Sequence, residues 1–94
     1  MVLDEQRGSI QVAGKPVRLT HKEFDLLSLL AEYPGQLFSR DKLLDTVWGF
    51  DYSGDIRTVD THIRRLRAKL ETAGLTGCAI GTVWGRGYRL EVPV

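Results

Sequence analysis

The sequence predicts a single α+β domain in which a small antiparallel sheet, three helices and a C-terminal β-hairpin follow one another. Short runs of alternating polar and apolar residues lie at both ends of the chain, and three helical patterns with start and stop signals lie between them. The length of 94 residues is that of one domain with one core.

The first 19 residues have the pattern of short strands. Residues 2–3 are one candidate, and residues 9–12 and 15–19 alternate around a turn at Ala13-Gly14. Pro16 lacks the N–H that a central strand donates, so its strand lies at an edge or begins there. A strand at residues 2–3 has no upstream partner, and we therefore expect this chain to be a piece of a longer protein.

The first helix is predicted over residues 21–33. Thr20 and Glu23 have the spacing of a capping box, in which each side chain accepts a hydrogen bond from the other residue's N–H. Pro34-Gly35 ends the helix. Its apolar face consists of Phe24, Leu27, Leu30 and Ala31, flanked by Leu26 and Tyr33.

A second, shorter helix is predicted over residues 40–48. Ser39 is a suitable N-cap, and Asp41 in the first turn complements the helix dipole. The buried side is expected to comprise Leu43, Leu44, Val47 and Trp48. Residues 49–55 then form a loop that carries two aromatic side chains.

The third helix is predicted from Thr58, its N-cap, to Ala73, with Gly74 terminating it. Four apolar residues spaced four, three and four apart form one narrow stripe: Val59, Ile63, Leu66 and Leu70. The opposite face carries Arg57, Thr58, Thr61, Arg64, Arg65 and Ala68. Such a face is typical either of an ordinary solvated helix or of a helix that enters a nucleic-acid groove.

Residues 79–84 and 88–92 are strand-like runs joined by Gly85-Arg86-Gly87, and Pro93 is predicted to end the second strand. Three helices followed by a two-stranded wing predict a winged helix-turn-helix. In that fold the third helix lies in the major groove, and the hairpin reaches a neighbouring groove or the backbone.

The charge distribution is uneven although the net charge is only +1. Residues 1–54 hold six basic and eight acidic residues, whereas residues 55–94 hold seven and four. Most of the positive charge of residues 55–94 lies on the third helix, which suggests a side that faces a polyanion.

Several function classes find no support in the sequence. Apolar runs are too short for a membrane helix, the N-terminus lacks a signal-peptide pattern, and the lone Cys78 fits a reducing cytoplasm. His21, His62 and Cys78 lack metal-ligand spacing, and no serine has the context of a nucleophile. Gly85-x-Gly87 joins two strands rather than a strand and a helix, which excludes a nucleotide-binding loop. We expect no enzyme activity, cofactor or metal.

Five ordered blocks resemble the DNA-binding effector domain of OmpR/PhoB-type two-component response regulators. The blocks are Leu19-Thr20-x-x-Glu23-Phe24-x-Leu26-Leu27, Pro34-Gly35-x-x-Phe38-Ser39-Arg40, Leu43-Leu44-x-x-Val47-Trp48-Gly49, Arg57-Thr58-Val59-Asp60-x-His62-Ile63-x-Arg65-Leu66-Arg67-x-Lys69-Leu70 and Thr82-Val83-x-Gly85-x-Gly87-Tyr88-Arg89. The resemblance covers about residues 9–91. It implies that the whole chain, residues 1–94, is a winged-helix effector domain.

The resemblance implies that a phosphorylatable receiver domain precedes the domain in its parent, and that the parent is cytoplasmic. Membrane-anchored activators of the ToxR/CadC type share the effector fold and remain an alternative parent. In the family, protomers bind direct-repeat half-sites in double-stranded DNA as head-to-tail dimers and contact RNA polymerase. A different class, a winged-helix protein-interaction module without DNA function, is disfavoured by the basic face of the third helix.

The resemblance also suggests roles for residues of the recognition helix, 58–73. Thr61 and Arg65, one turn apart, are predicted to read base edges, and an Arg can pair with guanine O6 and N7. The predicted contacts to the DNA backbone are Arg57, Thr58, His62, Arg64, Thr82, Tyr88 and Trp48. For His62 a structural role is the alternative. Arg67 is expected to pair with Asp60 or Glu71 rather than with DNA, and Lys69 to be solvated.

The wing, residues 82–89, departs from one common family pattern, which has an Arg at the position of Trp84. Arg86 at the tip is therefore a candidate for a minor-groove contact, and Trp84 for packing against sugar and backbone. The alternative for Trp84 and Tyr88 is the core of the hairpin. In the loop before the third helix, the residues predicted to contact RNA polymerase are Phe50, Asp51, Tyr52, Ser53 and Gly54; Phe50 and Tyr52 could instead cover the edge of the core.

Overall fold

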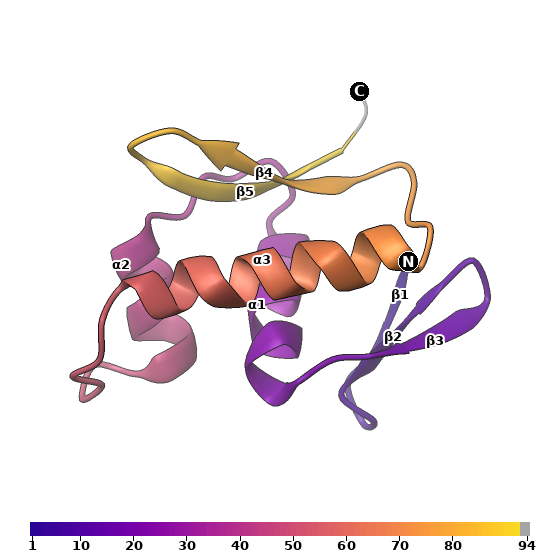
Figure 1. Cartoon of the computed structure of the whole chain (residues 1–94), viewed down its shortest axis with the longest axis horizontal. Helices are drawn as coiled ribbons and strands as arrows, with labels where there is room; N and C mark the ends of the chain where they lie inside the picture. Colours follow the sequence, from indigo (N-terminus) through magenta and orange to yellow (C-terminus); the bar gives the residue numbers. More distant parts are fainter. Residues whose placement is uncertain (93–94) are drawn as a thin grey trace.

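The computed structural model describes residues 1–92 and confirms the predicted winged helix-turn-helix (Figure 1). Its elements are β1 (Val2–Asp4), β2 (Ser9–Val12), β3 (Lys15–Arg18), α1 (His21–Glu32), α2 (Arg40–Leu43), the π-helical turn η1 (Leu44–Trp48), α3 (Arg57–Thr72), β4 (Ala79–Val83) and β5 (Gly87–Glu91). Pro93 lies outside the described residues. Within residues 1–92, no helix has the length and apolarity that crossing a bilayer demands.

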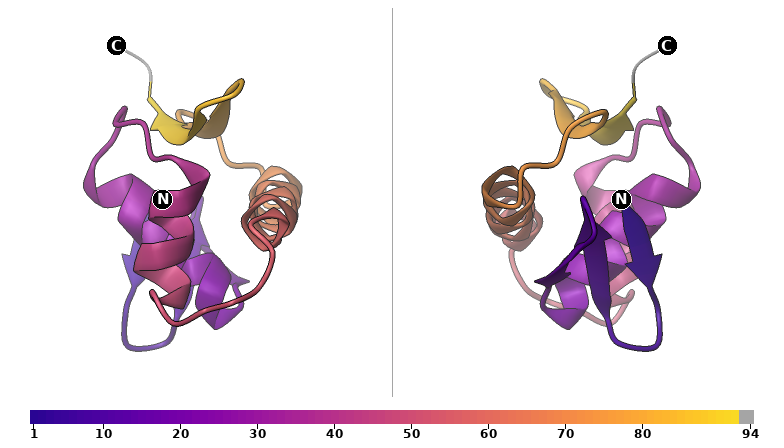
Figure 2. Two further views of the ribbon diagram at one scale, coloured as in Figure 1. Left: turned by 90° about the vertical axis from the view of Figure 1, so that its left-hand side faces the viewer. Right: turned by 90° about the vertical axis from the view of Figure 1, so that its right-hand side faces the viewer.

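The N-terminal sheet is antiparallel in the order β1-β2-β3. Ile10 and Val12 of β2 point into the core and are almost completely buried. Pro16 pairs with Gln11 in the edge strand β3, as its missing N–H predicts. The right view of Figure 2 shows this sheet in front of the helices and away from the C-terminal hairpin.

Helix α1 begins with the predicted capping box and ends within one residue of the predicted boundary. Thr20 Oγ1 accepts a hydrogen bond from Glu23 N–H at 3.2 Å, and Glu23 Oε1 accepts one from Thr20 N–H at 2.8 Å. Leu26, Leu27 and Leu30 are fully buried and form the centre of the core.

The second predicted helix is α-helical only in its first half. Ser39 caps α2 as predicted, with Oγ accepting from Lys42 N–H at 3.0 Å. Beyond Leu43 the chain widens into η1, where Gly49 N–H donates to Leu44 O, five residues back, at 3.2 Å. The prediction of a continuous α-helix to residue 48 is therefore wrong, because apolar spacing does not distinguish an α turn from a π turn.

Helix α3 buries the predicted stripe, since Val59, Ile63 and Leu66 are inaccessible and Leu70 is 4% exposed. The prediction of Thr58 as N-cap is wrong. The helix begins at Arg57, whose N–H donates to Asp55 Oδ1 at 2.9 Å, so the carboxylate before the helix satisfies this donor and Thr58 lies inside. Figure 2 shows α3 along one flank of the molecule, with its outer side uncovered by any other element.

The C-terminal hairpin lies above α3 in Figure 1, with β4 and β5 joined through residues 84–86. Gly87 belongs to β5 rather than to the turn. Phe38, from the segment before α2, adds a bridge to Tyr88, with both backbone hydrogen bonds at 2.9 Å. The wing is thereby fixed to the helix-turn-helix at its base.

Candidate nucleic-acid interface

The uncovered side of α3 presents two arginine side chains to solvent. Arg64 and Arg65 are exposed, and within residues 1–92 neither guanidinium forms an ion pair. Thr61 is half-buried, and its hydroxyl donates to Arg57 O at 3.2 Å, which leaves the oxygen able to accept. Two unpaired guanidinium groups beside a hydroxyl can bind phosphates and base edges.

Arg57 is exposed at the start of α3, but Asp55 already binds it. Its Nε and Nη2 donate to Asp55 Oδ2 at 3.0 and 2.8 Å. The hydrogen bonds from Arg57 lower the pKa of the Asp55 carboxyl, and the same pair raises the pKa of Arg57. Both groups are in solvent, so a phosphate can compete with Asp55 for this guanidinium.

His62 and Trp48 form a joint between α3 and η1. The His62 ring lies edge-on to the Trp48 ring, with centroids 5.0 Å apart. His62 Nδ1 lies 2.7 Å from Thr58 O, so this nitrogen carries the proton and donates. Lys22 Nζ lies 5.7 Å from the Trp48 ring centroid and donates to Val47 O at 2.9 Å. His62 thus has a structural partner at Nδ1, and Nε2 remains for another contact.

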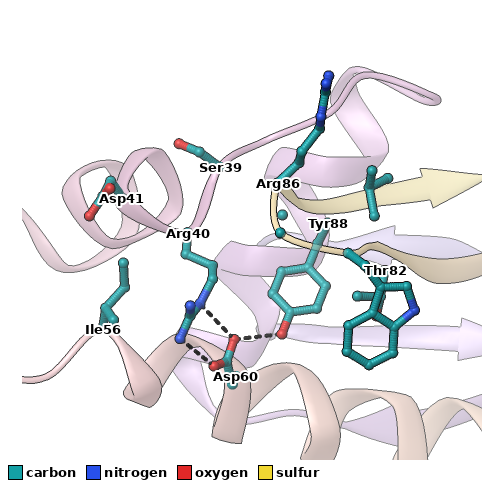
Figure 3. A pocket seen from close by; sticks show the side chains of 12 residues that line it. Ser39, Arg40, Asp41, Ile56, Asp60, Thr82, Arg86 and Tyr88 are labelled. Atoms are coloured by element: carbon teal, nitrogen blue, oxygen red, sulfur yellow. Dashed lines mark hydrogen bonds and ion pairs between the residues drawn. The ribbon is translucent and has the colours of Figure 1, made fainter.

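One carboxylate, Asp60, joins α2, α3 and the wing (Figure 3). Arg40 donates to it through Nε at 3.1 Å and Nη2 at 2.7 Å, and the Tyr88 hydroxyl donates at 2.5 Å. Burial and the bond to Asp60 raise the pKa of Tyr88 to about 12. The residue is only 8% exposed. The predicted phosphate contact of Tyr88 is wrong, because its only O–H donates to Asp60 and its ring belongs to the core.

Arg67 is structural, as predicted, but its predicted partners Asp60 and Glu71 are wrong. Its Nε donates to Ile80 O at 2.9 Å and its Nη2 to Thr82 Oγ1 at 2.5 Å. Thr82 is exposed and keeps its own hydroxyl proton for a phosphate. Arg67 bonds to β4 because it lies on the side of α3 that faces the hairpin.

The prediction that Lys69 is solvated is wrong, because the lysine pairs with Glu23. Its Nζ lies 2.5 Å from Oε1 of Glu23, whose side chain is 1% exposed. A helical wheel does not reveal this partner, which lies 46 residues earlier in the chain.

The wing tip extends into solvent. Trp84 is 90% exposed, so the alternative that places it in the hairpin core is wrong, whereas the same alternative is correct for Tyr88. Arg86 is exposed and directed away from the Asp60 cluster (Figure 3). An indole and a guanidinium at the end of a hairpin can bind sugar and phosphate together.

The loop before α3 carries Phe50, which is 87% exposed and therefore does not cover the core edge. Tyr52 packs against Trp48, with centroids 6.3 Å apart, and covers Gly54, where a Cβ would lie 2.3 Å from the tyrosine ring. The loop is anchored by Tyr52 and presents Phe50. Asp51 and Ser53 are exposed beside it.

Comparison with known proteins decides what this arrangement is. Residues 14–90 match the family model described as "Transcriptional regulatory protein, C terminal". The chain belongs to this family and is a DNA-binding effector domain of the OmpR/PhoB type.

Relatives and solved structures agree with the assignment. The heme response regulator HssR of Staphylococcus aureus is 44% identical over 91 residues, which are 97% of this chain and 40% of HssR. The chain thus spans about two-fifths of the curated relatives that it matches. The DNA-binding domain of Bacillus subtilis CssR superposes with a TM-score of 0.82 at 37% identity, covering 96% of this chain and 97% of that one. The DNA-binding domain of the response regulator AdeR, solved with an intercistronic region, gives 0.83 at 31%, covering 97% and 93%.

The family assignment places this effector domain among DNA-binding regulators rather than in an enzyme class. Among residues 1–92, no group of three His, Cys, Asp or Glu side chains could hold a metal ion. The side chains near the site whose contacts sequence patterns missed are Arg40, which binds Asp60, and Lys22, which binds Val47 O beside the Trp48 ring. Each acts across a tertiary contact, and only the family block containing Arg40 pointed to either of them.

Proposed function

We propose that this domain binds double-stranded DNA sequence-specifically, with α3 in the major groove and the wing at the adjacent minor groove or backbone. The observation that carries the proposal is the pair Arg64 and Arg65, which are exposed, form no ion pair among residues 1–92 and lie on the side of α3 that no other described element covers. An uncovered helix side with free guanidinium groups fits a groove about 12 Å wide.

The proposed contacts are of two kinds: base readers contact base edges, and phosphate clamps contact the DNA backbone. Arg65 and Thr61 read base edges, and Arg64 binds a phosphate. Thr58, Arg57, the free Nε2 of His62, Trp48 and the Thr82 hydroxyl contact the backbone around them. At the wing, Arg86 enters the minor groove and Trp84 packs against sugars.

The parent protein is proposed to be a two-component response regulator of the cytoplasm, in which an upstream receiver domain controls this domain by phosphorylation. Support comes from HssR, a response regulator of which this chain matches 40%. The DNA-binding domain of Escherichia coli CadC superposes with a TM-score of 0.80 at 31% identity, so the fold itself also fits the alternative parent. The higher identity to HssR favours the response regulator.

In the proposed assembly, two copies bind direct-repeat half-sites head to tail and the loop at residues 50–54 contacts RNA polymerase. Direct repeats suit a domain whose DNA-binding elements, α3 and the wing, lie side by side and cover successive grooves. Phe50 supports the polymerase contact, since an exposed aromatic ring on an anchored loop is a common anchor at protein interfaces.

Selection of bound duplexes from a random pool tests the DNA proposal, followed by a salt titration of the selected duplex. We expect a consensus half-site and a linear fall of log affinity with log salt concentration. Failure to bind any duplex at low salt would overturn the proposal and favour a protein-interaction module.

A further inference from the structure

Asp60 does not face the proposed DNA surface of α3. It lies on the side of the helix that faces the wing, and its carboxylate accepts three hydrogen bonds from two other elements: two from Arg40 at the start of α2, and one from Tyr88 of β5 (Figure 3). The planar Arg40 guanidinium binds both oxygens, which fixes the orientation of the carboxylate as well as its position.

The strand that Asp60 holds is also held at its backbone. Tyr88 exchanges two hydrogen bonds of 2.9 Å with Phe38, immediately before α2. Gly87 allows this approach, because a Cβ there would lie 2.0 Å from Phe38 O. The base of the wing is therefore clamped between the α2 entrance and the Asp60 carboxylate.

Arg67 supplies a second connection seven residues further along α3. It holds the other strand of the hairpin through Ile80 O and Thr82 Oγ1, and its guanidinium lies 5.4 Å from the Tyr88 ring centroid. Residues seven apart share one side of a helix. Both strands of the wing are therefore tied to the same side of α3 by polar contacts.

We propose that Asp60 is a positioning residue that sets the wing against α3, so that Arg86 reaches its groove while Arg65 is seated in the major groove. This inference rests on the proposed function. Two contact points on one body strengthen each other only when their spacing matches that of the sites, and a misplaced wing loses its share of the affinity. Asp60 thus acts on DNA binding through the placement of Arg86 and touches no DNA itself.

A double-mutant cycle on the selected duplex tests the inference, using wild type, Asp60→Asn, Arg86→Ala and the double variant. We expect Asp60→Asn to weaken binding about tenfold when Arg86 is present, and less than about twofold in the Arg86→Ala background. Asp41→Asn is the matched control: it removes an exposed carboxylate from the neighbouring α2 without touching the wing, and it should not weaken binding. Equal effects of Asp60→Asn in both backgrounds would overturn the inference.

Footprints separate positioning from general destabilisation. In Asp60→Asn, hydroxyl-radical protection by the wing should disappear, while methylation protection of guanine N7 under α3 persists. Loss of both protections together would contradict a positioning role. Tyr88→Phe, which removes one hydroxyl and keeps the buried ring, serves as the second variant if Asp60→Asn does not fold.

Residual dipolar couplings of the free domain test the wing's placement without DNA. We expect the orientation of β4 and β5 relative to α3 to change in both variants but not in Asp41→Asn, and unchanged couplings would overturn the inference. If wild type binds no duplex, the proposed function fails, and these couplings still decide whether Asp60 places the wing.

Discussion

Lys69 Nζ lies 2.5 Å from Glu23 Oε1, and this ion pair joins the C-terminal half of α3 to the first turn of α1. The same Glu23 oxygen accepts the Thr20 N–H of the capping box. One buried carboxylate therefore serves two purposes: it completes the N-terminus of α1 and fixes the recognition helix to it.

The first prediction concerns acid stability. Burial raises the pKa of Glu23, but the hydrogen bonds from Lys69 and Thr20 outweigh it, so the folded pKa lies below its ordinary value. A carboxyl with a lowered folded pKa stabilises the fold above its unfolded pKa of about 4.3, and this contribution is lost as pH falls through the folded value. We expect Glu23→Gln to cost about 2 kcal/mol at pH 7 and to flatten the acid side of the stability profile, measured by urea unfolding between pH 3 and 7. An acid profile identical to wild type would contradict this.

The second prediction concerns the close approach at the base of the wing. Gly87 has φ 147° and no room for a Cβ, whereas Gly85 has φ 76° and open space around it. Both Ala substitutions strain the backbone, but only Gly87→Ala also collides with Phe38 O. We expect Gly85→Ala to cost about 1 kcal/mol and Gly87→Ala at least about 2 kcal/mol more, in thermal or urea unfolding. Equal costs would show that the wing does not need the Phe38 bridge.

The third prediction separates a base reader from a phosphate clamp. Arg64→Ala should weaken binding to specific and random duplexes alike and reduce the salt slope by about 1. Its neighbour Arg65, the proposed base reader, has the same charge and is also exposed. Arg65→Ala is therefore the matched control for Arg64→Ala. Equal salt slopes for Arg64→Ala and wild type would contradict the clamp role.

The fourth prediction concerns the wing tip. Arg86→Ala should abolish competition by a ligand of the A·T minor groove, because the guanidinium no longer occupies that groove. Trp84→Ala should weaken binding and leave the competition intact, since the indole is assigned to sugar and backbone. Competition that persists in Arg86→Ala would return the minor-groove role to Trp84.

The fifth prediction concerns the anchored loop. Phe50→Ala should reduce transcription from a dependent promoter and leave DNA affinity within about twofold, because the ring is exposed and makes no core contact. Tyr52→Ala is the contrasting variant: it removes the packing on Trp48 and should lower both. Unchanged transcription with Phe50→Ala would contradict a contact between Phe50 and RNA polymerase.

The sequence predicts the elements and the basic side of α3 because these depend on local periodicity and capping. The Thr20–Glu23 box and the four-residue apolar stripe of α3 appear in the structure where their spacing places them. Local patterns fail where a partner comes from a distant segment. Lys69 pairs with Glu23, and Asp60 with Arg40 and Tyr88; no periodicity within α3 distinguishes these contacts from solvation.

Two further differences between the predicted and the observed helix ends have local causes. Asp55, two residues before Arg57, accepts the helix-starting N–H and displaces Thr58 from the cap that propensity favours. The hydrogen bond from Gly49 N–H to Leu44 O, five residues back, widens the end of the second helix, although its apolar positions fit an α-helix. Both occur at helix ends that flank the loop at residues 49–55.

The claim that α3 reads DNA through Arg65 is tested most directly by replacing each guanine of the selected half-site with 7-deazaguanine, which lacks the N7 acceptor. We predict one position at which this replacement weakens wild type by about 1–3 kcal/mol and has no effect on Arg65→Ala, whose own loss should be similar. Equal sensitivity of both proteins at every guanine, or sensitivity of neither, would contradict the account.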